Sequence, residues 1–450
     1  MTKDLSQLLW EKDQRIEDLT RQIKDLETQL KKEKNRADGY GLKWEEKLEI
    51  FEERAQNALP VLQENTELLI NKGEELDHLI IEGDNYHSLS ALSYTHKGKI
   101  DLIYIDPPYN TGKKDFVYND NYVDSEDDYR HSKWLSFMNK RLKLAKELLS
   151  DDGVIFISID DNEQANLKLL CDNIFGETAF INNFMWLHWK GKKNQQSRTL
   201  QQYCLVYGKK NRNDLPKWSI LKKAQWTFSN PDNDPRWDWF SGSISFSEKR
   251  SNKKSENFFE IISPSWISWK RQWMRTKDEM DIYLAENKIY FWLSPQYSNV
   301  PRLKIFPTDE NELIPDNILD NCWTTRDAQN KLNAILWTDV NEKWEKIVKF
   351  DNPKPIELIE HFISITNKAN NIIILDFFAW SGTTGHAVLE LNKQDGGKRQ
   401  FILCSSRENT THDPDKNICK NITYERVKRV LTWYTNAKGE EVEGQRTIQR

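Results

Sequence analysis

The sequence predicts an α/β fold in which a largely parallel sheet carries helices on both faces and is interrupted by an inserted region. Short apolar runs alternate with helical repeats between residues 79 and 159, and this alternation returns after residue 355. Such alternation favours a parallel sheet. A tryptophan-rich stretch without long periodic runs separates the two blocks. We therefore expect one sheet built from two separated parts of the chain.

The first block predicts three strands and two helices. Apolar runs at 79–81, 100–105 and 154–159 have the length and composition of buried strands. Residues 86–94 and 134–149 read as helices, and the second of these repeats apolar side chains at helical spacing. The three strands would therefore lie in one sheet, with the helices as crossover connections.

The second block continues the same pattern. A helix is predicted over 355–365, a strand over 372–376, the start of a helix over 386–391 and a strand over 401–404. The predicted organisation has four parts, which are an N-terminal helical segment at 1–70, the first part of the sheet domain at 71–181, an inserted domain at 182–340, and the second part of the sheet domain at 341–450.

The N-terminal segment carries a leucine and isoleucine seam. Apolar residues from Leu5 to Leu30 recur at spacings near three and four, with polar residues between them. This pattern predicts either an amphipathic helix that lies on the domain or a short coiled coil that joins two chains. The sequence leaves both interpretations open.

Composition limits the possible functions. The net charge is −5, so contacts with nucleic acid must come from local basic patches. The five cysteines form no C-x-x-C pair and no zinc-like spacing, which predicts free thiols and no metal site. The start of the chain does not resemble a signal peptide, and no apolar run reaches membrane-spanning length. We expect a cytoplasmic protein without a membrane partner.

The inserted region combines tryptophans with basic clusters. Ten of the 18 tryptophans lie between Trp186 and Trp292. The candidate phosphate contacts are Lys190, Lys192, Lys193 and Arg198, with glutamines nearby that can pair with base edges. An exposed loop without a role in DNA binding is the alternative. A second basic stretch, residues 249–254, fits either interpretation, and Trp266, Trp269 and Trp273 are interpreted as a folded core with a charged edge.

A proline-rich tetrapeptide follows the second predicted strand. It consists of Asp106, Pro107, Pro108 and Tyr109. In open α/β sheets, ligands bind at the carboxyl ends of the strands. The exocyclic amine of adenine is a poor nucleophile, and acceptors for its hydrogens, such as the Asp106 carboxylate and the Pro107 carbonyl, would free its lone pair. Tyr109 offers a face on which a flipped base can stack. An ordinary proline turn is the alternative.

A small-residue loop follows the predicted strand at 372–376. It runs from Asp376 to Gly385 and lies between that strand and a helix, where backbone can approach a nucleotide-like ligand. Glu408 follows the last predicted strand, where an acidic residue could bind ribose hydroxyls. A solvated loop carboxylate is an equally good interpretation of Glu408.

Together these motifs resemble the β class of amino methyltransferases, in which a D-P-P-Y loop precedes the F-x-G-x-G cofactor loop. The segments 41–45, 81–87, 101–149 and 352–355 also resemble modification subunits of type III restriction systems. This resemblance implies a Rossmann-like sheet, an inserted target-recognition domain, S-adenosyl-L-methionine as cofactor and double-stranded DNA as substrate. It also implies a homodimer and a helicase-nuclease restriction subunit as partner.

The resemblance assigns roles to individual residues. Asp106 to Tyr109 would hold the target base, and aspartate at the first position favours adenine N6 over cytosine N4, which remains the alternative. The implied cofactor contacts are Lys354, Pro355, Asp376, Phe378, Ala379, Ser381, Gly382 and Thr383.

The sequence departs from the family pattern at Trp380, where glycine is expected. An indole at this position would either occupy cofactor space or point away from it in a rearranged loop. We predict weakened cofactor binding, with a catalytically silent DNA-binding or scaffold subunit as the alternative to an active enzyme.

Overall fold

The computed structural model of the protein describes residues 44, 49, 59–70, 78–118, 121–124, 126–187, 199–221, 229–292, 299–306, 312–320, 324–340, 343–346, 350–366, 370–408, 416–432, 434–435 and 441–442. The chain forms two compact units. The sheet unit comprises Met1–Pro216, Asp316–Ser364 and Lys368–Arg450, and the inserted unit comprises Lys217–Pro315 and Ile365–Asn367. The predicted leucine seam and the candidate DNA contacts Lys190, Lys192, Lys193 and Arg198 lie outside the described residues.

The sheet unit is built on an eight-stranded sheet with the order β1-β19-β18-β2-β5-β7-β6-β15. Its strands are β1 (Leu79–Glu82), β2 (Ile100–Ile105), β5 (Leu149–Ile159), β6 (Phe180–Leu187), β7 (Gln201–Gly208), β15 (Ile318–Leu319), β18 (Ile373–Asp376) and β19 (Gln400–Ser405). Strands β18 and β19 lie between β1 and β2, which confirms that both blocks of the sequence contribute to one α/β sheet. The sheet is mixed, because β7 runs antiparallel to β5 and β6.

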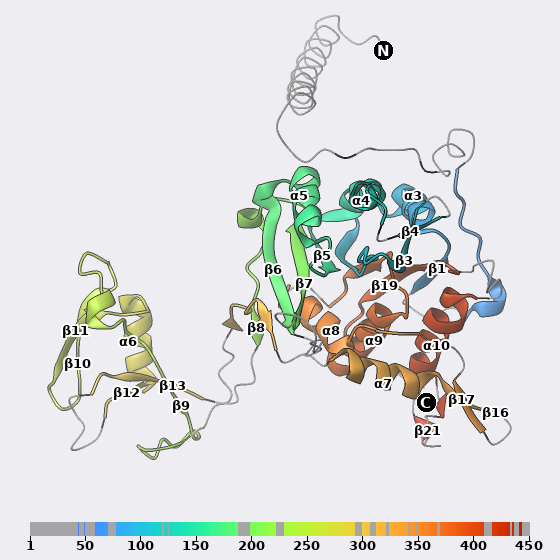
Figure 1. The fold of residues 1–450 in the computed structure, drawn as a ribbon. Helices are drawn as coiled ribbons and strands as arrows, with labels where there is room; N and C mark the ends of the chain where they lie inside the picture. The colour runs from blue at the N-terminus through green and yellow to red at the C-terminus, as the bar shows by residue number, and fades with distance from the viewer. Residues whose placement is uncertain are drawn as a thin grey trace, which may run out of the picture. The chain divides into compact units, whose positions relative to one another are not determined.

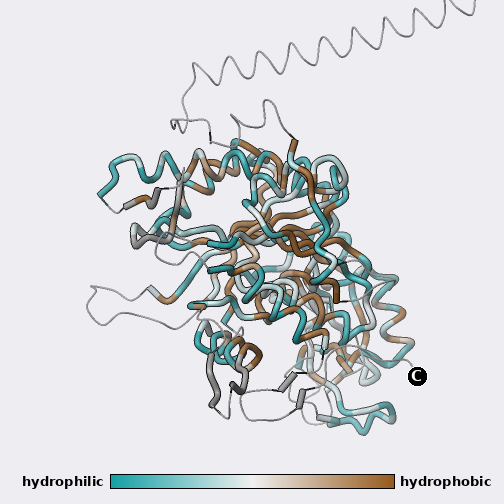
Figure 2. The backbone as a smooth tube through the Cα atoms, turned by 90° about the vertical axis from the view of Figure 1, so that its right-hand side faces the viewer, coloured by the Kyte–Doolittle hydropathy of each residue, from teal (hydrophilic) through white to brown (hydrophobic). Residues whose placement is uncertain are grey.

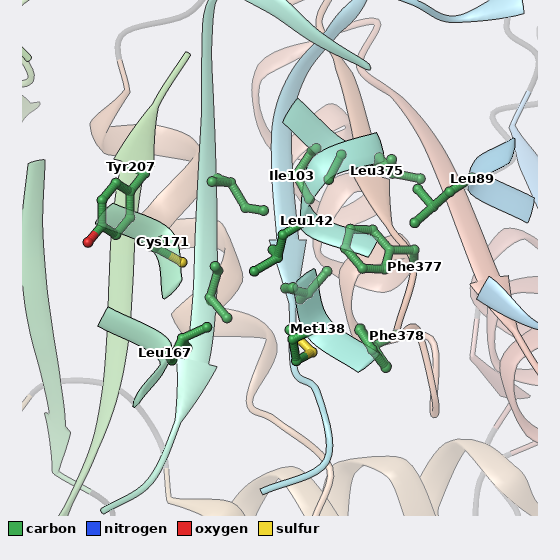
Figure 3. Packing of buried hydrophobic residues seen from close by; sticks show 14 of the residues in the cluster. Leu89, Ile103, Met138, Leu142, Leu167, Cys171, Tyr207, Leu375, Phe377 and Phe378 are labelled. Atoms are coloured by element: carbon green, nitrogen blue, oxygen red, sulfur yellow. The ribbon is translucent and has the colours of Figure 1, made fainter. Parts of the chain in front are cut away.

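Helices cover both faces of this sheet (Figure 1). One face carries α3 (Asn85–Thr95), α4 (Arg130–Leu148) and α5 (Gln164–Phe175), and the other carries α7 (Thr325–Leu336), α8 (Ile356–Ile365), α9 (Thr383–Asp395) and α10 (Glu425–Leu431). Hydrophobic segments concentrate along the central strands (Figure 2). Helix α4 buries Trp134, Met138 and Leu142, which are four residues apart and therefore lie on one face. Figure 3 shows the last two within the core cluster that also contains Phe377.

The inserted unit has a core of its own. It contains β9 (Phe240–Gly242), the hairpin β10 (Phe258–Ile262) and β11 (Ser268–Gln272), α6 (Lys277–Ala285), β12 (Ile289–Tyr290), β13 (Arg302–Ile305), and the short pair β8 (Ile220–Leu221) and β14 (Glu312–Leu313). Ile261 of the hairpin packs with Trp273, and with Met280 of α6. A two-stranded hairpin is marginal alone, so this packing on α6 stabilises it.

The structure divides the chain differently from the predicted inserted domain at 182–340. Strands β6 and β7 extend the sheet beyond β5, and β15 pairs with β6. The inserted unit is therefore the shorter stretch Lys217–Pro315, with three further residues. The sequence obscured this boundary because antiparallel strands follow one another without an intervening helix, so the α/β rhythm ends before the sheet does.

Shorter elements complete the described chain. They are β3 (Lys113–Tyr118) with β4 (Asn121–Asp124), β16 (Trp337–Val340) with β17 (Lys343–Lys346), β20 (Tyr434–Thr435) with β21 (Glu441–Val442), the π-helical turn η5 (Cys419–Tyr424), and the 3₁₀ turns η1 (Thr66–Leu68), η2 (Glu177–Ala179), η3 (Arg212–Asp214) and η4 (Glu248–Arg250). Among the helices of the described residues, none combines the length and apolar character that crossing a bilayer requires.

Candidate active site

The two predicted loops leave the sheet from neighbouring strands. β2 and β18 pair in parallel, with Leu102 opposite Ile374 and Ile103 opposite Leu375. Because parallel neighbours end at the same edge of a sheet, the loop that begins at Asp106 and the loop that follows Asp376 are adjacent. The loop assigned to the target base and the loop assigned to the cofactor therefore leave the sheet side by side.

Both loops line one hollow at this edge of the sheet. Its wall consists of Tyr104, Asp106, Phe350, Asn352, Pro353, Lys354, Asp376, Phe378, Ala379, Trp380, Ser381, Thr383 and Thr384. Six of the nine predicted cofactor residues belong to this wall, and three do not, namely Pro355, Gly382 and Glu408. The Glu408 carboxylate instead accepts a hydrogen bond from the Ser406 hydroxyl at 2.5 Å.

The Asp106 carboxylate is held by a lysine from a distant part of the chain. Lys354 Nζ lies 2.8 Å from each carboxylate oxygen, and it donates to the Tyr109 hydroxyl oxygen at 2.7 Å. The Tyr109 hydroxyl donates to Asp106 Oδ1 at 2.8 Å. Burial raises the pKa of Tyr109, so the phenol stays a neutral donor. From the sequence, Lys354 was assigned to the cofactor, whereas in the structure its ammonium contacts the Asp106 carboxylate.

Two indoles fix the backbone of the Asp106 loop. Trp134 Nε1 donates to the Pro108 carbonyl at 2.8 Å, and Trp380 Nε1 donates to the Asp106 carbonyl at 2.8 Å. These bonds hold the carbonyls on each side of Pro107, whose own carbonyl is the predicted acceptor for a target amine. Sequence reasoning missed the role of Trp134 because it fits the apolar stripe of its helix and reads as core.

Trp380 takes a backbone conformation that normally favours glycine. Its φ is +43°, and its ring stacks on Phe378 with centroids 6.5 Å apart. The indole also lines the hollow and reaches the Asp106 carbonyl. The backbone at Trp380 is therefore left-handed despite the large side chain, and the indole bridges the two loops. Its predicted effect on cofactor affinity stays a prediction.

Asp376 is a buried carboxyl group whose hydrogen-bond donors are neutral. Its carboxylate accepts from the Phe378 N–H at 3.0 Å and from the Thr384 hydroxyl at 2.5 Å. Burial is the main cause that raises the pKa of Asp376 to about 7, and the two hydrogen bonds offset part of this rise. A carboxyl group in this state gains free energy from a cationic ligand, since the cation compensates for the lost hydration.

A buried arginine holds the small-residue loop in place through hydrogen bonds. Arg426 Nη1 donates to the Ser381 carbonyl at 3.2 Å and to Thr383 Oγ1 at 2.9 Å. Burial lowers the pKa of Arg426 to about 9. Gly382 has a φ of +71°, and a Cβ there would lie 3.2 Å from the Thr423 carbonyl oxygen, so this position requires glycine. Sequence reasoning carried no signal for Arg426, because it lies on a helix far along the chain.

The amino-acid sequence matches a known protein family. The family model N6_N4_Mtase, described as DNA methylase, matches residues 100–413. The StyLTI Mod subunit of a type III restriction-modification enzyme from Salmonella typhimurium (strain LT2) is 33% identical over 83% of this chain and 59% of its own length. The EcoP15I Mod subunit from Escherichia coli is 30% identical over 78% of this chain and 63% of its own length.

A type II methyltransferase and one solved structure are also similar to this chain. The type II methyltransferase M.KpnI from Klebsiella pneumoniae is 32% identical over 73% of this chain and 80% of its own length. The solved structure of PvuII DNA methyltransferase (cytosine-N4-specific) aligns with 81% of this chain and 94% of that chain, with 13% identity and a TM-score of 0.37. This chain spans about three fifths of the length of the two Mod subunits.

Proposed function

We propose that this chain, which belongs to the DNA methylase family, transfers a methyl group from S-adenosyl-L-methionine to the N6 amino group of adenine in DNA. One observation carries the proposal. The Asp106 carboxylate and the loop that follows Asp376 line the same hollow, although they lie 270 residues apart in the sequence. That arrangement supplies an acceptor for an amine directly beside a site for a nucleoside cofactor.

The lining of the hollow offers a buried carboxyl group to a cationic ligand. Bound S-adenosyl-L-methionine supplies a methyl group activated by the positive sulfonium sulfur. The buried Asp376 carboxyl, whose donors are neutral, would stabilise a cationic end of this cofactor. Ser381 lines the hollow with a small side chain, and Arg426 holds the Ser381 carbonyl in place.

Asp106 would act on the target amine. Its carboxylate and the Pro107 carbonyl would accept the two amine hydrogens and free the nitrogen lone pair. The nitrogen would gain a bond to the methyl carbon while the carbon–sulfur bond breaks and leaves its electron pair on sulfur, and Asp106 would accept the displaced proton. Lys354 Nζ donates to both carboxylate oxygens in this structure, so the target amine would displace the ammonium when it binds. Most of the rate would come from this positioning.

Mass spectrometry of nucleosides tests the proposal. The full chain is incubated with S-adenosyl-L-methionine and genomic DNA from a host without DNA methylation, and the products are digested. We expect N6-methyladenine, and we expect Asp106→Ala to lower its rate of formation by about 100-fold or more. Asp151→Ala is a matched control, since Asp151 is exposed and does not line the hollow. N4-methylcytosine would instead establish the alternative base, and absence of both products from the native chain would support a silent subunit.

We further propose that the chain serves a type III restriction-modification system as a homodimer. Support comes from the two Mod subunits that match most of this chain. Sedimentation equilibrium would report the dimer, and copurification with a coexpressed helicase-nuclease subunit would report the restriction partner. A chain that is monomeric and does not copurify with the helicase-nuclease subunit would limit the proposal to methyl transfer.

A further inference from the structure

The β10–β11 hairpin of the inserted unit ends in a tight turn that presents a tryptophan. Ser263 N–H donates to the Ile267 carbonyl at 2.9 Å, and Trp266 N–H donates to the Ser263 carbonyl at 3.0 Å. The Ser263 hydroxyl oxygen accepts from Ile267 N–H at 3.0 Å and lies 2.9 Å from the Ser265 hydroxyl. These bonds fix the turn from both the backbone and the side chains, so the tip is rigid before any ligand arrives.

The Trp266 side chain is 88% exposed, which is unusual for an indole. Its φ of +59° adds a backbone cost that a residue with a Cβ rarely accepts without compensation. The neighbouring strand residue Ile262 is also exposed, at 57%. Within the described residues, the inserted unit leaves more than half of each of these two residues exposed. A ligand that covers the tip would bury these two side chains.

Positive charge surrounds this hairpin. Residues 243–276 contain seven basic and three acidic side chains, a net charge of +4, whereas the whole chain has −5. Exposed cations in this segment are Lys249, Arg250, Lys253, Lys254 and Lys270. Residues 249–254 form a basic loop that is attached to β11. Asn252 N–H donates to the Gln272 side chain at 2.7 Å, and Arg271 donates to the Phe246 carbonyl at 3.1 Å. The cations and the exposed indole therefore belong to one small structure.

We propose that this hairpin is a DNA-docking element in which the Trp266 indole stacks on or between bases while the basic loop contacts phosphates. Cations beside a rigid aromatic tip match a ligand that offers both phosphates and flat bases. The inference rests on the proposed function, because methylation of adenine requires bound DNA. It also moves the expected DNA contact away from the stretch at 190–198.

Fluorescence anisotropy with a labelled mixed-sequence DNA duplex tests the proposal in the full chain. Trp266→Ala should raise Kd by about fivefold to 100-fold, the range that loss of one stacked base produces. Trp266→Phe should retain most of the affinity, because it keeps a flat ring. Lys253→Gln combined with Lys254→Gln should lower the slope of log Kd against log salt by about 2. The variants should fold normally, since all three positions are exposed, and far-ultraviolet circular dichroism checks this.

Trp237 provides the matched control in the same unit. It is 68% exposed but lies in an acidic stretch beside Asp234 and Asp238. Trp237→Ala should leave Kd unchanged. Equal losses in Trp237→Ala and Trp266→Ala would show a general effect of exposed indoles and overturn the proposal. Anionic phospholipid vesicles are the second probe, and a Trp266→Ala defect confined to vesicles would also overturn it.

The same proteins separate this inference from the proposed function. If the native chain makes no methylated base but Trp266→Ala still weakens duplex binding, the enzyme proposal fails and the docking element stands. If the native chain methylates adenine and Trp266→Ala binds the duplex with native affinity, the docking proposal fails alone.

Discussion

Asp376 of the sheet unit and Asp234 of the inserted unit are both buried carboxyl groups, yet their surroundings are opposite. Asp234 accepts from Arg236 Nη2 at 2.7 Å and from Lys304 Nζ at 2.8 Å. These donors, with Arg236 first, hold the pKa of Asp234 well below its usual range. Asp376 receives hydrogen bonds from neutral donors, and burial raises its pKa to about 7.

The difference distinguishes structural from functional burial of charge. In the inserted unit, the cations that pair with Asp234 are side chains of the same unit, and Lys304 and Asp234 are almost inaccessible to solvent. Asp376 lines the hollow, and its hydrogen bonds come from a backbone amide and a hydroxyl group rather than from a cation. A buried carboxyl group of this kind reduces stability, and a cationic ligand would compensate for that reduction.

Removal of the Asp376 charge gives the largest expected effect, and it depends on pH. Between about pH 4 and 7 the folded state keeps the Asp376 proton while the unfolded chain has released it, so stability falls as pH rises through this window and then levels off. Asp376→Asn cannot titrate and should lack this fall. The native chain should lose up to about 4 kcal/mol relative to the variant across the window. Urea unfolding at several pH values measures the difference, and parallel curves would contradict it.

Lys304→Met should destabilise the inserted unit by about 3 kcal/mol, because it leaves Asp234 buried with one cation fewer. The substitution keeps most of the side-chain volume, so the lost charge is the main change. Urea unfolding followed by tryptophan fluorescence measures it. Lys277→Met is the control, since the Lys277–Asp281 pair is 3.7 Å apart and largely exposed. Equal effects of the two substitutions would remove the distinction between buried and exposed pairs.

Asp106 lies between the two extremes, because Lys354 pairs with its carboxylate but its side chain still faces the hollow. Trp380→Phe removes the hydrogen bond to the Asp106 carbonyl and keeps an aromatic ring. A lost hydrogen bond of about 1 kcal/mol predicts a kcat about fivefold lower, with little change in the KM for S-adenosyl-L-methionine. Initial rates measure both constants, and Trp237→Phe should match the native chain. A lower affinity for the cofactor with an unchanged kcat would show that the indole serves the cofactor instead.

Much of this arrangement could be predicted from the sequence, because short motifs and strand patterns carry it. The runs 100–105 and 372–376 predicted two strands that are neighbours in the sheet, and the loops that follow them line one hollow. The lysine on Asp106 could not be predicted from spacing, since Lys354 lies 248 residues away. Long-range pairs depend on how the chain returns to the sheet, which local patterns do not encode. The exposure of Trp266 was also missed, because a tryptophan close in sequence to Trp269 and Trp273, which pack in the core of the inserted unit, is readily interpreted as core.

The pH dependence of cofactor affinity should give the smallest effect and the finest test of the comparison. If the cofactor binds the charged form of Asp376, affinity follows the charged fraction, which rises from about 0.5 at pH 7 to about 0.9 at pH 8 for a pKa of about 7. The affinity for S-adenosyl-L-methionine should therefore roughly double over this interval. Isothermal titration calorimetry of the native chain and Asp376→Asn measures it. The cofactor's own amino group titrates equally for both proteins, so the ratio of their affinities isolates Asp376. A ratio that stays constant with pH would mean that the cofactor does not contact the Asp376 charge.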